Sequence, residues 1–376
     1  MSAITVGGDL VHYEVLGRGR PVILMHGWLG SWRYWIPAMR LLQLKYRVYA
    51  LDLFGFGDSG KNPEKYTISH QVNLLDEFMR QLGIPKAAMI GHGLGAQIMA
   101  QFGSQNQERV ARLLITNAPL FDPGDLGSRP MPGRKVALTR ADDTNPLATT
   151  RKLIEQAEAE FNSSTAETLK RRPAGLDEAL SAASAPTVPS GSNQTITDPA
   201  KMIDRESLKQ MALARGEAAV RGEDIRPSHA NGDNPLKDRI GSQSLDALLA
   251  RCFRRNEPEY EKLHADLGKM DDAVVRRITL SFDSGKMLDT LRQLSMPTMI
   301  LHGTDDPLIE APNDAVWNYL TLERDDLVLP LPLPGVRHFP MLEYEPFMRL
   351  VNDFLEVPDI TKIEVKGINR WRRRSR

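Results

Sequence analysis

Three alternating glycines, Gly91, Gly93 and Gly95, interrupt an apolar run that then resumes with the spacing of a helix. The pattern indicates a strand, a sharp turn and a helix. It has the frame of a nucleophile elbow, G-x-S-x-G, whose central side chain projects from the sheet while a backbone amide faces a developing oxyanion. The central residue here is Gly93, which has no side chain. Taken alone, the stretch also fits a glycine-rich turn without chemistry.

Short apolar runs alternate with helix-like segments on both sides of this turn. A hairpin is expected over residues 3–16, strands over 22–25, 47–51, 86–91, 110–117 and 326–332, and helices over 32–44, 68–82, 94–106, 313–322 and 346–355. The run 297–306 is expected to be a further strand that ends in a loop with two acids. This alternation predicts an α/β fold with a mostly parallel central sheet flanked by helices. The active surface should lie beyond the carboxyl ends of the strands.

The middle of the chain has a different texture, without strand-like runs from about residue 121 to 285. Helical patterns are expected over 148–172, 203–221 and 243–265, and the Ala-, Ser-, Pro- and Thr-rich residues 173–200 are expected to be mobile. We therefore divide the chain into a discontinuous core of residues 1–120 and 286–357, a helical insert of residues 121–285, and a basic tail of residues 358–376.

Composition excludes several classes of function. The 376 residues carry 48 basic and 48 acidic side chains, so no net field attracts nucleic acid. The single cysteine rules out an internal disulfide framework, and no metal, phosphate-loop or dinucleotide motif occurs, so no cofactor or metal is expected. The sequence contains no apolar run of about 18 residues, the length that a membrane-spanning helix needs, so no membrane span is expected. We expect a cytoplasmic protein with a small-molecule partner and, at most, a weak anionic-surface contact through the Arg-rich tail.

Four landmarks follow one another along the chain. They are His26-Gly27, the Asp52-x-x-Gly55-x-Gly57-x-Ser59 loop, the Gly91-x-Gly93-x-Gly95 turn, and a late acid followed by a late histidine. In these residues and their order the sequence resembles the α/β-hydrolase fold family over residues 1–120 and 286–357. The resemblance implies that residues 121–285 form a helical cap over a pocket.

The resemblance also implies where the charged catalytic groups lie. The late histidine is His338, within the run from Gly335 to Pro346, and its orienting acid is Asp306, the third residue after Gly303. Asp305 is an alternative acid. Some relatives carry the acid after the sixth strand, where Asp122 lies.

An oxyanion hole is the second implied feature of the site. Its donors would be the backbone amides of Trp28, which follows Gly27, and of Leu94, which follows the centre of the elbow. Because both donors belong to the main chain, they do not depend on a serine. The aromatic residues of 28–35 could line an apolar pocket or pack the first helix into the core.

The implied chemistry fails at its first step, because Gly93 offers no oxygen for His338 to deprotonate. Ser31 and Ser59 lie in loops away from the elbow, and His92 should point beneath the turn. Cys252 lies in the insert among arginines that would lower the pKa of a thiol.

Two main readings follow, and they belong to different classes of protein. The first is a pseudo-hydrolase that binds a small apolar or ester-like ligand. The second is a hydrolase or lyase in which the His338–Asp306 dyad activates water or acts on a proton of the substrate. A glycine that replaces a natural serine, or a nucleophile from the insert, stays open as a third.

Overall fold

The structure is a computed structural model that describes residues 2–129, 234–343 and 345–363. The helices expected over 148–172 and 203–221 and the segment 173–200 lie outside the described residues, as do residues 364–376 of the basic tail.

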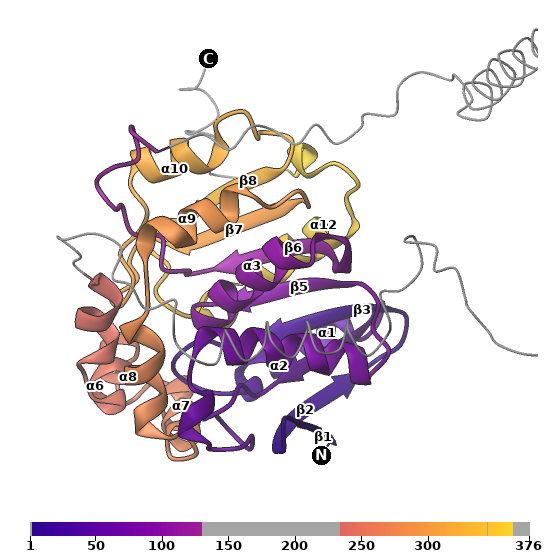
Figure 1. The fold of residues 1–376 in the computed structure, drawn as a ribbon, viewed down its shortest axis with the longest axis vertical. Helices are drawn as coiled ribbons and strands as arrows, with labels where there is room; N and C mark the ends of the chain where they lie inside the picture. The colour runs from indigo at the N-terminus through magenta and orange to yellow at the C-terminus, as the bar shows by residue number, and fades with distance from the viewer. Residues whose placement is uncertain (1, 130–233, 344, 364–376) are drawn as a thin grey trace, which may run out of the picture. The chain divides into compact units, whose positions relative to one another are not determined.

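Eight strands form one sheet in the order β1-β2-β4-β3-β5-β6-β7-β8 (Figure 1). The strands are β1 (Ser2–Val6), β2 (Asp9–Leu16), β3 (Arg20–Met25), β4 (Tyr46–Leu51), β5 (Ala87–His92), β6 (Val110–Thr116), β7 (Thr298–Gly303) and β8 (Val328–Leu333). The pairs β1/β2 and β2/β4 are antiparallel, and the pairs from β4 through β8 are parallel. The expected mostly parallel sheet is therefore confirmed.

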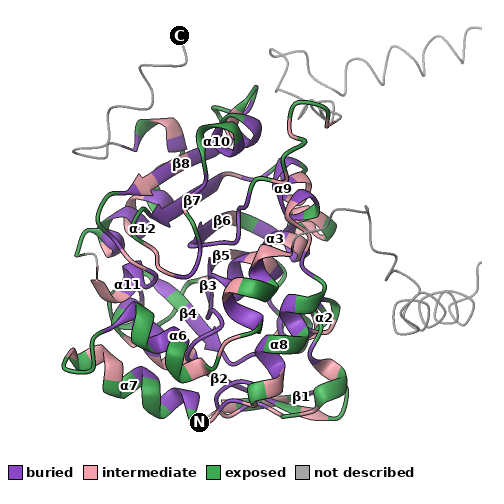
Figure 2. Ribbon diagram, turned by 90° about the vertical axis from the view of Figure 1, so that its left-hand side faces the viewer, coloured by how far each residue is buried: buried purple, intermediate pink, exposed green. Residues whose placement is uncertain are grey.

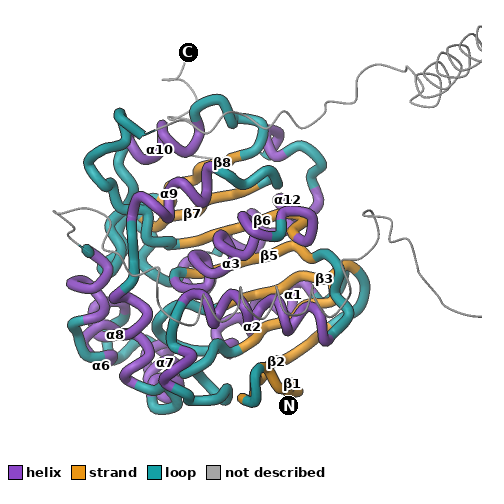
Figure 3. The backbone as a smooth tube through the Cα atoms, in the orientation of Figure 1, coloured by secondary structure: helices purple, strands orange, loops and turns teal. Residues whose placement is uncertain are grey.

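Helices flank this sheet and alternate with its strands along the chain (Figure 3). The α-helices are α1 (Ile36–Leu42), α2 (Ile68–Gln81), α3 (Leu94–Gln105), α6 (Leu245–Cys252), α7 (Pro258–Leu267), α8 (Asp272–Leu280), α9 (Ser284–Arg292), α10 (Asp314–Thr321), α11 (Pro340–Glu343) and α12 (Phe347–Glu356). Helix α3 contacts α2 and α9, and α1 contacts α12. These layers bury the sheet from both sides.

The central strands are buried because helices cover both faces of a parallel sheet. Residues 22–25 of β3 and every residue of β7 are buried, and Figure 2 shows this band of burial through the middle of the molecule. Continuous apolar runs, rather than alternating ones, are what this environment requires. The short apolar runs in the sequence therefore locate the strands well.

The helical pattern over 243–265 is wrong as a single helix. Helix α6 ends at Cys252, Phe253 is extended with φ −135° and ψ 146°, and α7 starts with Pro258. Proline fits the first turn of a helix but not its interior, so it divides the segment. Helices α8 and α9 are additional elements that the sequence pattern did not reveal.

Helices α6, α7 and α8 lie against loops that follow the carboxyl ends of the strands. In the loop after β3, Ser31 donates a hydrogen bond to Asp266 of α7, at 2.8 Å. The N-cap of α8, Asp271, donates its backbone N–H to the carbonyl of Gly55 in the loop after β4, at 2.9 Å. Arg251 of α6 donates to the carbonyl of Pro307, in the loop after β7. These contacts border the edge of the sheet where the candidate site lies.

Within the described residues, no helix is both long and apolar enough to cross a membrane.

Candidate active site at the carboxyl edge of the sheet

A tight turn at Gly93 joins β5 to α3 and forms the centre of the site. Gly93 has φ 52° and ψ −109°, a left-handed conformation that favours glycine. Its backbone N–H donates to the carbonyl of Thr116 on β6, and Gly95 donates its N–H to the carbonyl of His26 after β3, each at 3.0 Å. The turn is thereby fixed against both neighbouring strands.

His338 and Asp306 meet beside this turn. His338 Nδ1 lies 2.8 Å from Asp306 Oδ2, and both side chains are fully buried. The other carboxylate oxygen of Asp306 accepts the backbone N–H groups of Leu308, at 2.8 Å, and Ile309, at 3.1 Å. The structure thus pairs Asp306, and not Asp305 or Asp122, with His338.

Asn117 is a contributor that the sequence reasoning missed. It follows β6 with φ 48°, and its Nδ2 donates to Asp306 Oδ2 at 2.7 Å and to the carbonyl of Arg337 at 3.3 Å. Its place directly after a strand was the available signal, because carboxyl ends of parallel strands meet at one edge. Asn117 fixes both the acid and the loop that carries His338.

These contacts assign the proton of the dyad. Burial opposes ionisation of Asp306, but the charge of His338 and its hydrogen bond outweigh burial and hold the pKa of Asp306 below its ordinary value. An ionised carboxylate only accepts, so His338 carries a proton on Nδ1. The other ring nitrogen, Nε2, is buried and has no hydrogen-bond partner in the described structure. The dyad therefore presents one unoccupied nitrogen.

The predicted oxyanion donors come from two segments of the site, Trp28 from the loop after β3 and Leu94 from the start of α3. Trp28 and Leu94 are both fully buried. Their backbone N–H groups make no hydrogen bond to any residue that the structure describes. Leu94 begins helix α3, and an unpaired amide at the start of a helix is suited to an anionic or strongly polarised oxygen.

A chain of hydrogen bonds beneath the turn connects the three loops of the site. The N–H of Gly27 donates to Tyr34 Oη at 2.6 Å, Tyr34 Oη lies 2.9 Å from His92 Nδ1, and His92 Nε2 lies 2.8 Å from the carbonyl of His338. The carbonyl only accepts, so Nε2 of His92 donates and its Nδ1 accepts from the tyrosine hydroxyl. His92 is buried, and its two ring nitrogens link Tyr34 to the loop that carries His338.

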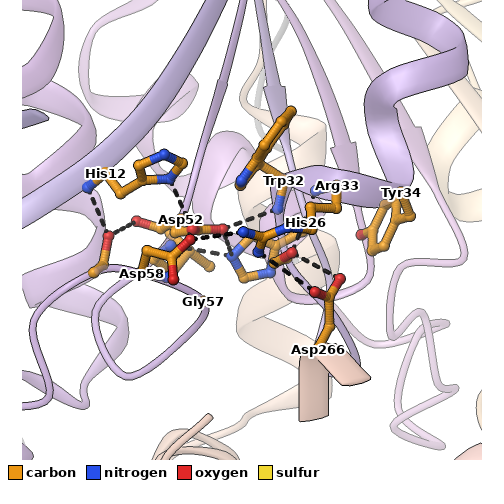
Figure 4. Close-up of polar contacts among 12 residues, drawn as sticks. His12, His26, Trp32, Arg33, Tyr34, Asp52, Gly57, Asp58 and Asp266 are labelled. Atoms are coloured by element: carbon orange, nitrogen blue, oxygen red, sulfur yellow. Dashed lines mark hydrogen bonds and ion pairs between the residues drawn. The ribbon is translucent and has the colours of Figure 1, made fainter. Parts of the chain in front are cut away.

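A second polar network supports the loop after β4 (Figure 4). Asp52 is fully buried and accepts hydrogen bonds from the backbone N–H groups of Trp32 and Asp58 and from His12 Nδ1, at 2.9 to 3.0 Å. His12, Asp52 and Asp58 place possible ligand atoms within 4.8 Å of one another. Asp58 already pairs with Arg33 and Lys269, so protein cations compensate its charge. The contacts account for this cluster as a structural network.

A family model described as the alpha/beta hydrolase fold matches residues 20–320. The chain belongs to this family. Its fold class and the resemblance carried by its motifs are thereby confirmed.

Curated relatives match only part of this hydrolase-fold protein. It is 36% identical over 122 residues to bifunctional epoxide hydrolase 2 of Rattus norvegicus, covering 31% of this chain and 22% of that protein. It is 34% identical over 110 residues to a soluble epoxide hydrolase of Corynebacterium sp. (strain C12), covering 29% and 38%. It is 33% identical over 123 residues to the putative carbamate hydrolase RutD of Caulobacter vibrioides, covering 31% and 46%. The match thus spans less than half of each relative.

Solved structures share the fold over most of the chain. The enol-lactonase from Burkholderia xenovorans LB400 has a TM-score of 0.54 at 15% identity, covering 94% of this chain and 99% of that one. A thermophilic esterase from Thermogutta terrifontis has a TM-score of 0.54 at 17% identity, covering 94% and 98%. At such identities the likeness establishes the fold alone.

The alternative nucleophiles of this hydrolase-fold protein are engaged elsewhere. Ser31 Oγ donates to Asp266, and Ser59 Oγ donates to the carbonyl of Asp52. Cys252 is fully buried, and burial raises the pKa of its thiol well above its ordinary value, outweighing the neighbouring arginines. Arg251 and Arg337 do lower this pKa, but burial disfavours the thiolate more strongly, so the net shift is upward.

Two further sequence expectations concern the acids and the aromatic residues. Asp305 and Asp122 are exposed, and Asp122 accepts hydrogen bonds from Gly124 and Asn313. Trp28, Tyr34 and Trp35 are buried, whereas Trp32 is half-buried. The aromatic cluster therefore packs mainly into the core rather than around an open pocket.

Buried histidines give the protein a predicted acid sensitivity. Burial lowers the pKa of His26, His92 and His302, so folding favours the neutral form of all three. An unfolded histidine binds a proton near pH 6.5. Below that pH the unfolded chain binds more protons, and the free energy of unfolding falls as pH falls. Replacing one histidine should reduce this slope by up to about 1.4 kcal/mol per pH unit.

Urea unfolding of the parent and of His92→Gln between pH 6.5 and 5.5 measures that difference. Equal slopes would contradict a neutral buried His92.

His12 affects stability in a different pH range: burial lowers its pKa, but the hydrogen bond and charge of Asp52 outweigh burial and raise it. Its contribution is therefore lost as pH rises above about 6.5.

Proposed function

We propose that this protein is a pseudo-hydrolase, a hydrolase scaffold that binds a small apolar or ester-like ligand without serine turnover. The observation that carries the proposal is Gly93 at the centre of the elbow, where no side-chain oxygen faces His338. Removal of a catalytic serine costs about a million-fold in turnover, roughly 8 kcal/mol of transition-state stabilisation. Neither buried serine of the neighbouring loops replaces it, because both hydroxyls are hydrogen-bonded elsewhere.

The burial of the site also favours this reading. Trp28, Leu94 and His338 are all fully buried. A rapidly turning-over enzyme needs a path for substrate and product, whereas a binding protein needs only to admit its ligand. Backbone amides and a histidine are suited to hold the polar end of such a ligand, and the apolar residues around them suit its hydrocarbon part.

A second candidate is a hydrolase or lyase that uses the His338–Asp306 dyad without a side-chain nucleophile. It is favoured by the unoccupied Nε2 of His338, which can accept a proton from water or from the substrate. The curated relatives named above are epoxide and carbamate hydrolases. Small epoxides and carbamates are therefore the substrate classes to test for this candidate.

An ester panel separates the two candidates. We expect the parent protein to release no product above the buffer blank from p-nitrophenyl acetate, butyrate or octanoate, or from styrene oxide. The same compounds should raise the melting temperature where they bind the folded state. Turnover by the parent that disappears in His338→Ala would establish the dyad enzyme and refute the pseudo-hydrolase.

A further inference from the structure

The indole ring of Trp28 lies against Gly93. A Cβ atom built on Gly93 would lie 2.7 Å from Cζ3 and 2.9 Å from Cε3 of that ring. Optimal contacts between carbon atoms are about 3.5–4.0 Å, so the two cannot coexist without movement. The edge of the ring therefore fills the volume that the first atom of a nucleophilic side chain would need.

The same ring also faces His338. The ring centroids are 6.5 Å apart, and the ring planes differ by 28°. Trp28 Nε1 and His338 Nε2 are both buried and lack hydrogen-bond partners in the part of the chain described here. A buried polar atom without a hydrogen-bond partner destabilises the folded state. Once the ring moves, a ligand or water that bonds to these two nitrogens removes this cost.

Gly93 and Trp28 are thus complementary in shape. Both residues are fully enclosed, and their contact joins the loop after β3 to the turn after β5. A glycine at the elbow lets the ring approach, and the ring lies beside His338 of the dyad. Their separation by 65 positions means that only the folded chain brings them together.

We propose that Trp28 closes the dyad to small molecules and determines what can reach His338. In the closed position the indole ring packs against Gly93, which leaves room for it because it has no side chain. A ligand reaches His338 only when the ring moves away from Gly93. The size of the group admitted then depends on the side chain at position 28. This inference is independent of the proposed function, because it concerns access to His338 and not what the site does with a ligand.

Diethyl pyrocarbonate tests access to His338 without any natural ligand. The reagent acylates an unprotonated imidazole nitrogen: an N–C bond forms and a C–O bond of the anhydride breaks. The leaving ethyl carbonate takes up the proton that the ring loses and decomposes to ethanol and carbon dioxide. Peptide mass spectrometry reports the modification at each histidine. We expect Trp28→Ala to accelerate labelling of His338 at least tenfold, with Trp28→Leu giving a smaller increase.

Two controls keep this experiment decisive. His264 is exposed, so it should be labelled at the same rate in every variant. Trp35 is another buried tryptophan that packs against Tyr34 and Phe347, so Trp35→Ala tests for general loosening and should leave His338 protected. Trp28→Leu replaces Trp28→Ala if the smaller side chain prevents folding.

The proposal fails if His338 is labelled as fast in the parent as in both Trp28 variants, because the site would then already be open. It fails equally if His338 stays unlabelled in the folded Trp28 variants, because another group would then close the site. Neither result depends on turnover or on ligand binding. Failure of the gate is therefore distinguishable from failure of the pseudo-hydrolase proposal.

Discussion

Gly93→Ser alone should react only slowly with a fluorophosphonate probe. The double variant Gly93→Ser with Trp28→Ala should be labelled at least about a hundred-fold faster, which corresponds to an activation free energy lower by roughly 2.7 kcal/mol. The physical reason is the 2.7 Å separation between the ideal Cβ at position 93 and the Trp28 ring. The serine must displace this ring before its oxygen can approach His338 Nε2. Removing the indole supplies that space.

The expected reaction is an ordinary substitution at phosphorus. A bond forms between the serine oxygen and phosphorus, the P–F bond breaks, fluoride leaves, and the serine proton passes to His338 Nε2. Adding His338→Ala to the double variant should abolish the labelling. Mass spectrometry of the intact protein measures the adduct.

The contact between Trp28 and Gly93 should also appear as a coupling energy, measured from the free energies of unfolding of the two single variants and the double variant. Trp28→Ala leaves a cavity and costs about 3–5 kcal/mol. Gly93→Ser costs less when the ring is absent, so the double variant should be about 1–3 kcal/mol more stable than additivity predicts. Rapid labelling of Gly93→Ser with Trp28 intact, or strictly additive stabilities, would contradict the shape complementarity of these residues.

The second large effect is expected at the acid of the dyad. Asp306→Asn should lower the free energy of unfolding at pH 7 by about 3–5 kcal/mol, because the amide cannot accept all the hydrogen bonds that the buried carboxylate accepts. Four N–H groups converge on Asp306, those of Leu308, Ile309, Asn117 and His338. An amide accepts through only one oxygen and turns its own N–H groups toward these donors.

Asp305→Asn is the matched control, since it makes the same chemical change one residue earlier. Asp305 is exposed and accepts a hydrogen bond from Thr304 Oγ1. Its replacement should change stability by no more than about 0.5 kcal/mol. Urea unfolding of both variants measures the contrast. Equal losses would refute the structural assignment of Asp306 as the partner of His338.

The sequence by itself determined the fold of this protein. Strands buried on both faces of a parallel sheet require continuous apolar runs, and residues 22–25 and 113–115 show them plainly. The glycines at 91, 93 and 95 marked the turn because a tight strand–helix turn excludes side chains. At these positions the residue types of a short segment were enough to predict its secondary structure. It was less informative over 243–265, where the apolar periodicity continues across the break between α6 and α7.

Only the tertiary structure decided how the site is filled. The contact of Trp28 with Gly93 and that of Asn117 with Asp306 join residues 65 and 189 positions apart. Neither contact follows from the spacing of residues along the chain. Burial likewise reversed the expected pKa shift of Cys252, because solvent exclusion outweighs neighbouring charges and is a property of the folded molecule. The motifs gave the positions of the candidate groups, and packing determined which of them meet and what separates them.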